Sequence, residues 1–185
     1  MPKLQTLYQN AIKFAAKKHA DQNQVISGTN IPYVVHLSNV AMEILIASEK
    51  TKDFNAKFAV QVALLHDTLE DTKTTFEELS QEFNEEIAQA VLALTKNAEI
   101  SKEERMMDSL LRIKKLPKEV WAVKLADRIT NLQIPPKIWS LDKIKEYQKE
   151  ASEILHELNG GNDYLEKRLS EKIIKYSKYI TSEVI

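Results

Sequence analysis

The spacing of apolar residues is the feature that most constrains this chain, because they recur every three or four positions along almost its whole length. That period places them on one face of an α-helix, whereas a half-buried strand would need strict alternation. Only three glycines and five prolines occur in 185 residues, so few positions break a helix. The pattern predicts an all-α fold of about nine helices, with no alternating run long enough for a sheet.

The interruptions of this pattern predict where each helix begins and ends. We expect a first helix over 3–20 and then a polar loop over 21–32 that contains Gly28 and Pro32. Later helices are expected after loops, prolines or capping residues: 33–48, 55–69, from Thr75, from Asn84, from Ser101, from Pro117, 140–158 and 163–181. A chain of this length can bury one sizeable core, so we expect a single domain over residues 1–185.

Composition excludes several classes of function. With no cysteine there is no disulfide framework, zinc ribbon, iron–sulfur cluster or thiol nucleophile. A net charge of −1 argues against nucleic acid as a partner. No run reaches about 18 apolar residues and the first residues do not resemble a signal peptide, so we expect no membrane partner and a cytoplasmic protein. Glycine-rich phosphate loops are absent, which leaves phosphate binding to side chains or a metal.

The segment HDTLED, residues 66–71, places four ionisable groups directly after an apolar run. On a continuous helix His66 and Glu70 are four residues apart, and Asp67 is three from Glu70 and four from Asp71, so these groups share one side. Three neighbouring carboxylates repel each other, and a divalent cation relieves that repulsion. Imidazole with carboxylate suits Mn, Fe, Ni or Zn. The alternative is a solvated helix end with no ligand.

Two isolated polar residues in other apolar segments extend this set. His36 lies in YVVHLSNV and Asp127 lies in VKLADRITNL. Each alone could be a core polar group that is hydrogen-bonded or ion-paired. Together with His66 and Asp67 they supply two imidazoles and two carboxylates from three helices, which predicts a metal site.

A metal-bound water has a pKa near neutrality and is then a usable nucleophile. Glu70 and Asp71 lie one turn from the His66-Asp67 pair and are the candidate catalytic carboxylates. Phosphate groups would also need cations, any of which could instead be an ion-paired surface residue. These candidate cations are Lys17, Lys18, Arg105, Lys124 and Arg128. Arg128, directly after Asp127, could instead orient that carboxylate.

The order H…HD…D resembles the HD superfamily of metal-dependent phosphohydrolases. Longer strings, FAAKKH, PYVVH, ALLHDTLEDT, KLADRITNL and EYQKEA, resemble the hydrolase domain of the stringent-response alarmone synthetase/hydrolases and, more closely, the small alarmone (ppGpp) hydrolases. The resemblance covers about residues 5–175, and its most specific element is HDTLEDT. It implies a multi-helix HD-domain bundle with one metal, usually Mn²⁺, on His36, His66, Asp67 and Asp127.

The resemblance also implies an activity and further site residues. Glu70 and Asp71 match the acidic pair that positions or deprotonates the attacking water. Asn131 and Tyr147 match substrate-contacting residues, and Arg105 matches an arginine of the small members. The family reaction is hydrolysis of the 3′-pyrophosphate of guanosine 3′,5′-bis-polyphosphates (ppGpp and pppGpp), releasing pyrophosphate and GDP or GTP.

Two departures from the family leave the nucleotide open. The loop 21–30 has no basic residue where the family has an Arg or Arg-Lys element, and the connection after Asn131 is shorter and contains Pro135 and Pro136. An adenine alarmone or a nucleoside phosphate is therefore an alternative substrate for an HD phosphohydrolase. A helical nucleotide-binding adaptor without activity is the non-enzymatic alternative.

Other residues have simpler interpretations. His19 and His156 lie on amphipathic helices and are expected at the surface or at the boundary between surface and core. The larger aromatic residues are expected in the core. Trp139 is the exception that retains a functional interpretation, because family members have a tryptophan just before the pocket tyrosine.

Overall fold

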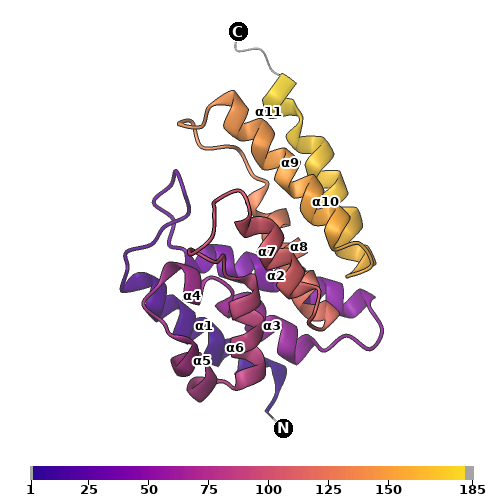
Figure 1. Ribbon diagram of the computed structural model, residues 1–185. Helices are drawn as coiled ribbons and strands as arrows, with labels where there is room; N and C mark the ends of the chain where they lie inside the picture. The colour runs from indigo at the N-terminus through magenta and orange to yellow at the C-terminus, as the bar shows by residue number, and fades with distance from the viewer. Residues whose placement is uncertain (1, 182–185) are drawn as a thin grey trace.

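The computed structural model describes residues 2–181, which form helices and no strand (Figure 1). The helices of this described part are α1 (Leu4–Ala20), α2 (Val34–Lys50), α3 (Ala56–Leu65), α4 (Thr68–Asp71), α5 (Phe76–Glu82), α6 (Glu85–Leu94), α7 (Arg105–Ile113), α8 (Lys118–Asn131), α9 (Leu141–Glu157), α10 (Asp163–Tyr176) and α11 (Lys178–Thr181). The predicted all-α class is confirmed. No helix of residues 2–181 is long and apolar enough to cross a membrane.

Two of the expected helices are each divided, so residues 2–181 hold eleven helical segments where about nine were predicted. The expected helix over 55–69 ends at Leu65, and the backbone of Asp67 (φ −100°, ψ 1°) leaves the helical region before α4 begins. The Thr68 hydroxyl donates to the Leu65 carbonyl at 2.6 Å and satisfies one acceptor at the end of α3. The expected helix over 163–181 is interrupted at Ser177, between α10 and α11.

Side-chain caps begin five of the helices in residues 2–181, namely α3, α5, α6, α9 and α10. Thr75 accepts from the Glu78 N–H at 3.2 Å and Asn84 accepts from the Ile87 N–H at 2.8 Å, as their sequence positions predict. The predicted start at Ser101 is wrong, because its hydroxyl donates to the Glu104 carboxylate at 2.7 Å and α7 begins only at Arg105. The segment before α7 is therefore a loop, and it becomes one wall of the pocket described below.

Helix α3 lies at the centre of the molecule and is buried on every face from Phe58 to Leu65. Helices α1, α2, α6 and α8 pack around it, and α2 also packs on α8 (Figure 1). A helix that is apolar all round is stable only when neighbours cover it in this way. The packing brings the first turn of α2, the end of α3 and the second half of α8 to one region of the molecule.

Helices α9 and α10 form an antiparallel pair on the outside of α8 (Figure 1). The turn between them contains Gly161, where a side chain would meet the Leu158 carbonyl oxygen at 2.9 Å and Trp121 at 3.0 Å. Arg168 of α10 forms a bidentate pair with the buried Glu43 of α2 at 2.5–2.8 Å. This pair fixes the α9–α10 unit to the core and thereby positions α9 beside the pocket.

Loop 21–32 folds back on itself through an isolated bridge between Val25 and Pro32. Gly28 at its tip has φ +76°, a conformation that favours glycine, and a side chain there would meet Pro136 at 3.2 Å. The loop before α2 and the connection after α8 therefore touch each other.

Candidate active site

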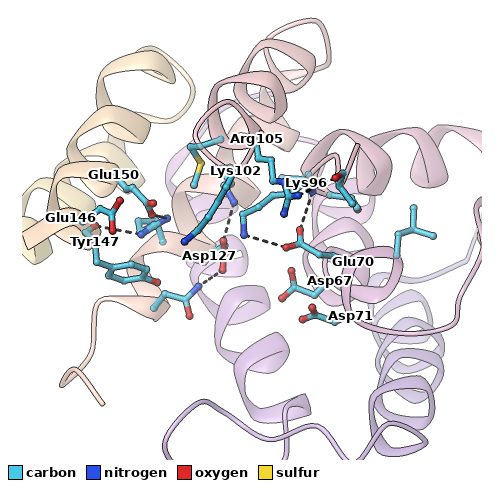
Figure 2. A pocket seen from close by; sticks show the side chains of 18 of the residues that line it. Asp67, Glu70, Asp71, Lys96, Lys102, Arg105, Asp127, Glu146, Tyr147 and Glu150 are labelled. Atoms are coloured by element: carbon cyan, nitrogen blue, oxygen red, sulfur yellow. Dashed lines mark hydrogen bonds and ion pairs between the residues drawn. The ribbon is translucent and has the colours of Figure 1, made fainter. Parts of the chain in front are cut away.

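The four predicted metal ligands meet where α2, α3 and α8 converge. Asp67 and Asp127 line a pocket (Figure 2), and the two histidines lie beneath them, at what we call the floor of this pocket. His36 lies in the first turn of α2, His66 caps the end of α3, and Asp127 lies just before the last turn of α8. Asp67 occupies the turn between α3 and α4, which is why the helix ends there. His36 and His66 are buried, at 5% and 3% exposed.

The imidazole nitrogens and carboxylate oxygens of these four residues lie close together. His66 Nε2 lies 2.9 Å from Asp67 Oδ2 and 3.6 Å from Asp127 Oδ1, and His36 Nε2 lies 3.4 Å from the same Asp127 oxygen. The possible ligand atoms of His36, His66 and Asp67 all lie within 4.8 Å of one another. Four donors of the predicted types therefore surround one small volume.

The second nitrogen of each imidazole fixes its tautomer. His66 Nδ1 lies 2.8 Å from the Ala63 carbonyl oxygen, to which it can only donate. His36 Nδ1 lies 3.4 Å from the Thr130 hydroxyl, whose own proton is donated to the Asp127 carbonyl. In both neutral rings Nε2 then carries a lone pair, and these Nε2 atoms are buried with no hydrogen-bond partner among residues 2–181. Such an arrangement is typical of metal-binding histidines.

The carboxylates make this region strongly attractive to a cation. Burial opposes a charge on His66, but Asp67 and Asp127 outweigh it and raise its pKa well above the usual value. Burial also disfavours charge on Asp127, yet Lys124 and the two histidines hold its pKa well below the ordinary range. Without a cation, the raised pKa keeps a proton on His66. A divalent cation would take the place of that proton, and two imidazoles facing two carboxylates fit such a cation by both charge and donor type.

Asp127 is held by two neighbours on its own helix. Asn131 Nδ2 donates to Asp127 Oδ1 at 2.6 Å, and Lys124 Nζ lies 3.4 Å from Asp127 Oδ2. Both residues line the pocket, as their predicted roles in substrate binding require.

The pocket above this floor has a volume of about 670 Å³, within the usual range for a small-molecule site. Its lining combines acidic, cationic and aromatic side chains. The acidic residues are Asp67, Glu70, Asp71, Asp127, Glu146 and Glu150, the cationic residues are Lys96, Lys102, Arg105, Lys124, Arg128 and Lys143, and the aromatic residues are Tyr33, Trp139 and Tyr147.

The two predicted catalytic carboxylates have different surroundings. Glu70 Oε2 accepts from the Lys96 N–H at 2.9 Å and Glu70 Oε1 pairs with Lys96 Nζ at 3.1 Å. The Asp71 carboxylate has no hydrogen-bond partner within the described chain, and it lies beside Asp67 in Figure 2. Burial and then the charges of Asp67 and Glu70 raise the pKa of Asp71 to about 6. The break after Leu65 thus turns Glu70 toward Lys96 instead of toward His66.

Half of the cationic residues that line the pocket come from the loop before α7 and from the first residue of α7 (Figure 2). Arg105, a predicted site residue, donates to the carbonyls of Ala98 and Ile100 at 3.0 and 3.2 Å and so holds this loop in shape. Lys96 and Lys102 were missed by sequence reasoning. Their spacing before Arg105 is visible in the sequence, but nothing there indicates that the loop covers the pocket.

Lys18, also predicted to contact substrate, is not among the pocket-lining residues. Its ammonium group pairs with Glu78 at 2.5 Å and lies 5.2 Å from the centre of the Phe14 ring. These contacts join α1 to α5.

Arg128 points away from Asp127 and toward α9. Its guanidinium lies 4.3 Å from the centre of the Tyr147 ring and 3.2 Å from Glu150. Trp139 also contacts Tyr147, edge-on, with 5.0 Å between ring centres. The core placement expected for most aromatic residues does not hold for Trp139, which lines the pocket and retains its functional interpretation.

Two more residues near the floor were missed. Tyr33 lines the pocket and its hydroxyl donates to Asp67 Oδ2 at 2.5 Å. His19, expected at the surface or at the boundary between surface and core, is only 1% exposed. Its burial could have been found from its spacing, because Ala11, Ala15 and His19 are four residues apart and share the face of α1 that packs on α3.

Comparison with known proteins shows similarity to the HD domain family and to curated pyrophosphohydrolases. Residues 11–162 match the family model described as HD domain. The chain is 34% identical over 169 residues to guanosine-3′,5′-bis(diphosphate) 3′-pyrophosphohydrolase of Danio rerio, covering 89% of this chain and 91% of that protein. A protein of the same name from Aquifex aeolicus is 34% identical over 151 residues, which cover 79% of this chain and 20% of that longer protein.

A solved structure has the same fold. It is described as a metazoan orthologue of SpoT that hydrolyses ppGpp, and it matches with a TM-score of 0.78 at 27% sequence identity. The match covers 95% of this chain and 97% of that one. The helical arrangement that brings the site together is therefore shared over nearly the whole length of both chains.

Proposed function

This chain belongs to the HD domain family, and we propose that it is a metal-dependent hydrolase that removes the 3′-pyrophosphate of ppGpp or pppGpp, releasing pyrophosphate and GDP or GTP. One observation carries the proposal: two buried imidazole lone pairs face two carboxylates at the floor of a pocket whose opposite wall is cationic. Similarity to curated 3′-pyrophosphohydrolases over about nine-tenths of the chain supports this substrate and bond.

His36, His66, Asp67 and Asp127 would hold one divalent metal. Two imidazoles with two carboxylates suit Mn, Fe, Ni or Zn, and we propose Mn²⁺ because it is the usual metal of the alarmone hydrolases that the sequence resembles. When bound, such a metal supplies an acidified water and polarises a phosphoryl oxygen. The protein supports it through the Nδ1 contacts of both histidines and through Asn131, which donates to Asp127.

The proposed general base is Asp71, and Glu70 acts mainly through the loop before α7. A base needs a free lone pair near the attacking water, and the Asp71 carboxylate is unpaired beside Asp67. Both oxygens of Glu70 are occupied by Lys96. Glu70 thereby fixes Lys96 at the pocket wall, where it faces the phosphates that are hydrolysed.

The nucleotide would lie between the floor and α9. Tyr147 and Trp139 offer aromatic surfaces for a base or ribose, and Asn131, Lys124 and Arg105 offer donors for phosphate and sugar oxygens. Arg128 supports the Tyr147 ring instead of binding phosphate, because Glu150 and that ring occupy its guanidinium. Lys18 is left out of this set because it pairs with Glu78.

A substrate panel tests the proposal. The purified chain with Mn²⁺ should release pyrophosphate from ppGpp and pppGpp and no orthophosphate, and a chelator should abolish the reaction. The adenine alarmone should be included because loop 21–30 carries no basic residue to hold a guanine nucleotide. Faster turnover of the adenine compound would change the assigned base, and phosphate release from nucleoside monophosphates alone would overturn the proposed reaction.

A further inference from the structure

Tyr33 is not one of the four proposed metal ligands, but it contacts one of them. Its hydroxyl donates to Asp67 Oδ2 at 2.5 Å, the oxygen that also lies 2.9 Å from His66 Nε2. The orientation of the Asp67 carboxylate is thus set by a residue from α2's N-terminal cap.

His19 holds the Tyr33 ring from the opposite side. The two rings are stacked with 4.8 Å between centres and 27° between planes. His19 is buried, its Nδ1 is hydrogen-bonded to Gln24 Oε1, and burial lowers its pKa, so the ring is neutral. It gives Tyr33 a flat, uncharged surface.

Gln24 ties these two residues together through its backbone as well. Its N–H donates to the His19 carbonyl at 3.1 Å, and its own carbonyl accepts from the Tyr33 N–H at 3.2 Å. The end of α1 is thereby joined to the start of α2. Gln24 therefore holds both stacked rings, because it contacts His19 through its side chain and backbone and Tyr33 through its backbone.

Outer partners of this kind fix the orientation of metal ligands, and their loss typically costs about 10- to 100-fold in metal affinity or activity. We infer that Tyr33 is a positioning residue for the metal ligand Asp67, and that His19, held by Gln24, keeps Tyr33 in place. This inference rests on the proposed metal-dependent function. It assigns a role to a buried histidine and a pocket tyrosine that are not themselves among the proposed ligands.

The chain offers a matched control for the Tyr33 hydroxyl. Tyr8 also lies at the α1–α2 interface, and its hydroxyl contacts the Ser38 hydroxyl at 3.1 Å. Tyr8→Phe and Tyr33→Phe each remove one hydroxyl and keep the ring. A general loss of α1–α2 packing would affect both variants, whereas loss of ligand positioning would affect Tyr33→Phe alone.

The test measures Mn²⁺ binding without substrate. Metal-free wild type, Tyr33→Phe and Tyr8→Phe are titrated with Mn²⁺, and free Mn²⁺ is followed by electron paramagnetic resonance. We expect Kd to rise about tenfold or more for Tyr33→Phe and to stay within about twofold for Tyr8→Phe, with similar melting temperatures for the two metal-free variants. His19→Phe keeps the stacked ring but loses the Gln24 contact, so its Kd should lie between wild type and Tyr33→Phe.

The outcomes separate this inference from the proposed function. Wild type that binds Mn²⁺ while Tyr33→Phe binds it equally well would overturn the inference and leave the proposed function standing. Equal weakening in Tyr33→Phe and Tyr8→Phe would overturn it too, because the effect would then be one of packing. Wild type with no stoichiometric Mn²⁺ would overturn both.

Discussion

The floor of the pocket and its upper wall differ in how deeply their residues are buried. The floor comes from α2, α3 and α8, where His66 and Asp127 are 3% and 8% exposed and every ligand has a fixed partner. The wall comes from the loop before α7, the connection after α8 and the outer helix α9, where Ile134 and Ile138 are 78% and 87% exposed. The proposed chemistry thus lies on buried elements, and the proposed recognition of the nucleotide lies on more exposed segments, which tolerate sequence change better.

This difference explains where the chain departs from the family it resembles. The floor residues match the family's strings, whereas one departure lies in the wall, in the connection that contains Pro135 and Pro136. The other lies in loop 21–30, which contacts that connection at Gly28. Substitutions in the floor should therefore change metal binding and kcat, and substitutions in the wall should change KM. The following predictions test that division.

The largest effect is expected at the floor. His66→Ala removes a ligand and leaves the two carboxylates less compensated, so stoichiometric Mn²⁺ binding should be lost and kcat should fall by about 10³-fold or more, since the metal supplies several kcal/mol of transition-state stabilisation. His156→Ala, on the exposed side of α9, is the matched control and should behave as wild type. Metal analysis and pyrophosphate release measure both. Full activity in His66→Ala would contradict the claim that the floor residues determine metal binding and kcat.

The two acidic residues should differ from each other. Asp71→Asn should keep the metal and lower kcat by about 10²- to 10⁴-fold, the usual contribution of a general base. Glu70→Gln weakens the contact to Lys96 and should raise KM more than it lowers kcat. Equal losses of kcat in the two variants, with unchanged KM, would contradict separate roles for the pair.

The pH dependence of kcat should report the ionisation of Asp71. Its pKa is raised to about 6 by burial and by Asp67 and Glu70, and a base works only in its ionised form, so activity is present above that pKa and is lost as the pH falls through it. A bound cation near Asp71 would lower the pKa of this carboxyl and so move the loss of activity to lower pH. Between pH 7 and pH 5 we expect a fall of up to about tenfold that is absent in Asp71→Asn.

A smaller effect is expected at the wall. Lys102 lines the pocket, and Lys102→Ala should raise KM by about 3- to 10-fold with kcat nearly unchanged, as expected for one exposed cation near phosphate. Lys115→Ala, at an exposed lysine outside the pocket lining, is the control. The KM effect should shrink as salt is added. A fall in kcat without a change in KM would show that Lys102 acts in catalysis, as proposed for the floor residues, and not in substrate binding.

Local sequence signals predicted the helices well, and they failed where long-range packing decides the outcome. The caps at Thr75 and Asn84 are short-range and were predicted, as was the convergence of His36, His66, Asp67 and Asp127. The end of α3 at Leu65 was missed because an apolar run with good helix formers gives no local reason to stop.

The pocket wall was less predictable. The contact between Glu70 and Lys96 joins residues 26 positions apart, and no periodicity indicates it. His19 was misplaced because its neighbours Lys17 and Lys18 dominate the local composition, although its spacing from Ala15 marks the buried face. The roles assigned to Asn131 and Tyr147 remain predictions that the structure places at the pocket but does not test.

The central claim is that the buried histidine pair is a metal site that supports hydrolysis at a neighbouring carboxylate. The most direct test titrates metal-free wild type with Mn²⁺ and follows bound Mn²⁺ and pyrophosphate release from ppGpp in the same samples. The rate should rise in proportion to bound Mn²⁺ and reach its plateau at one Mn²⁺ per chain. A rate that is independent of Mn²⁺, or a fully loaded protein that releases no pyrophosphate, would contradict it.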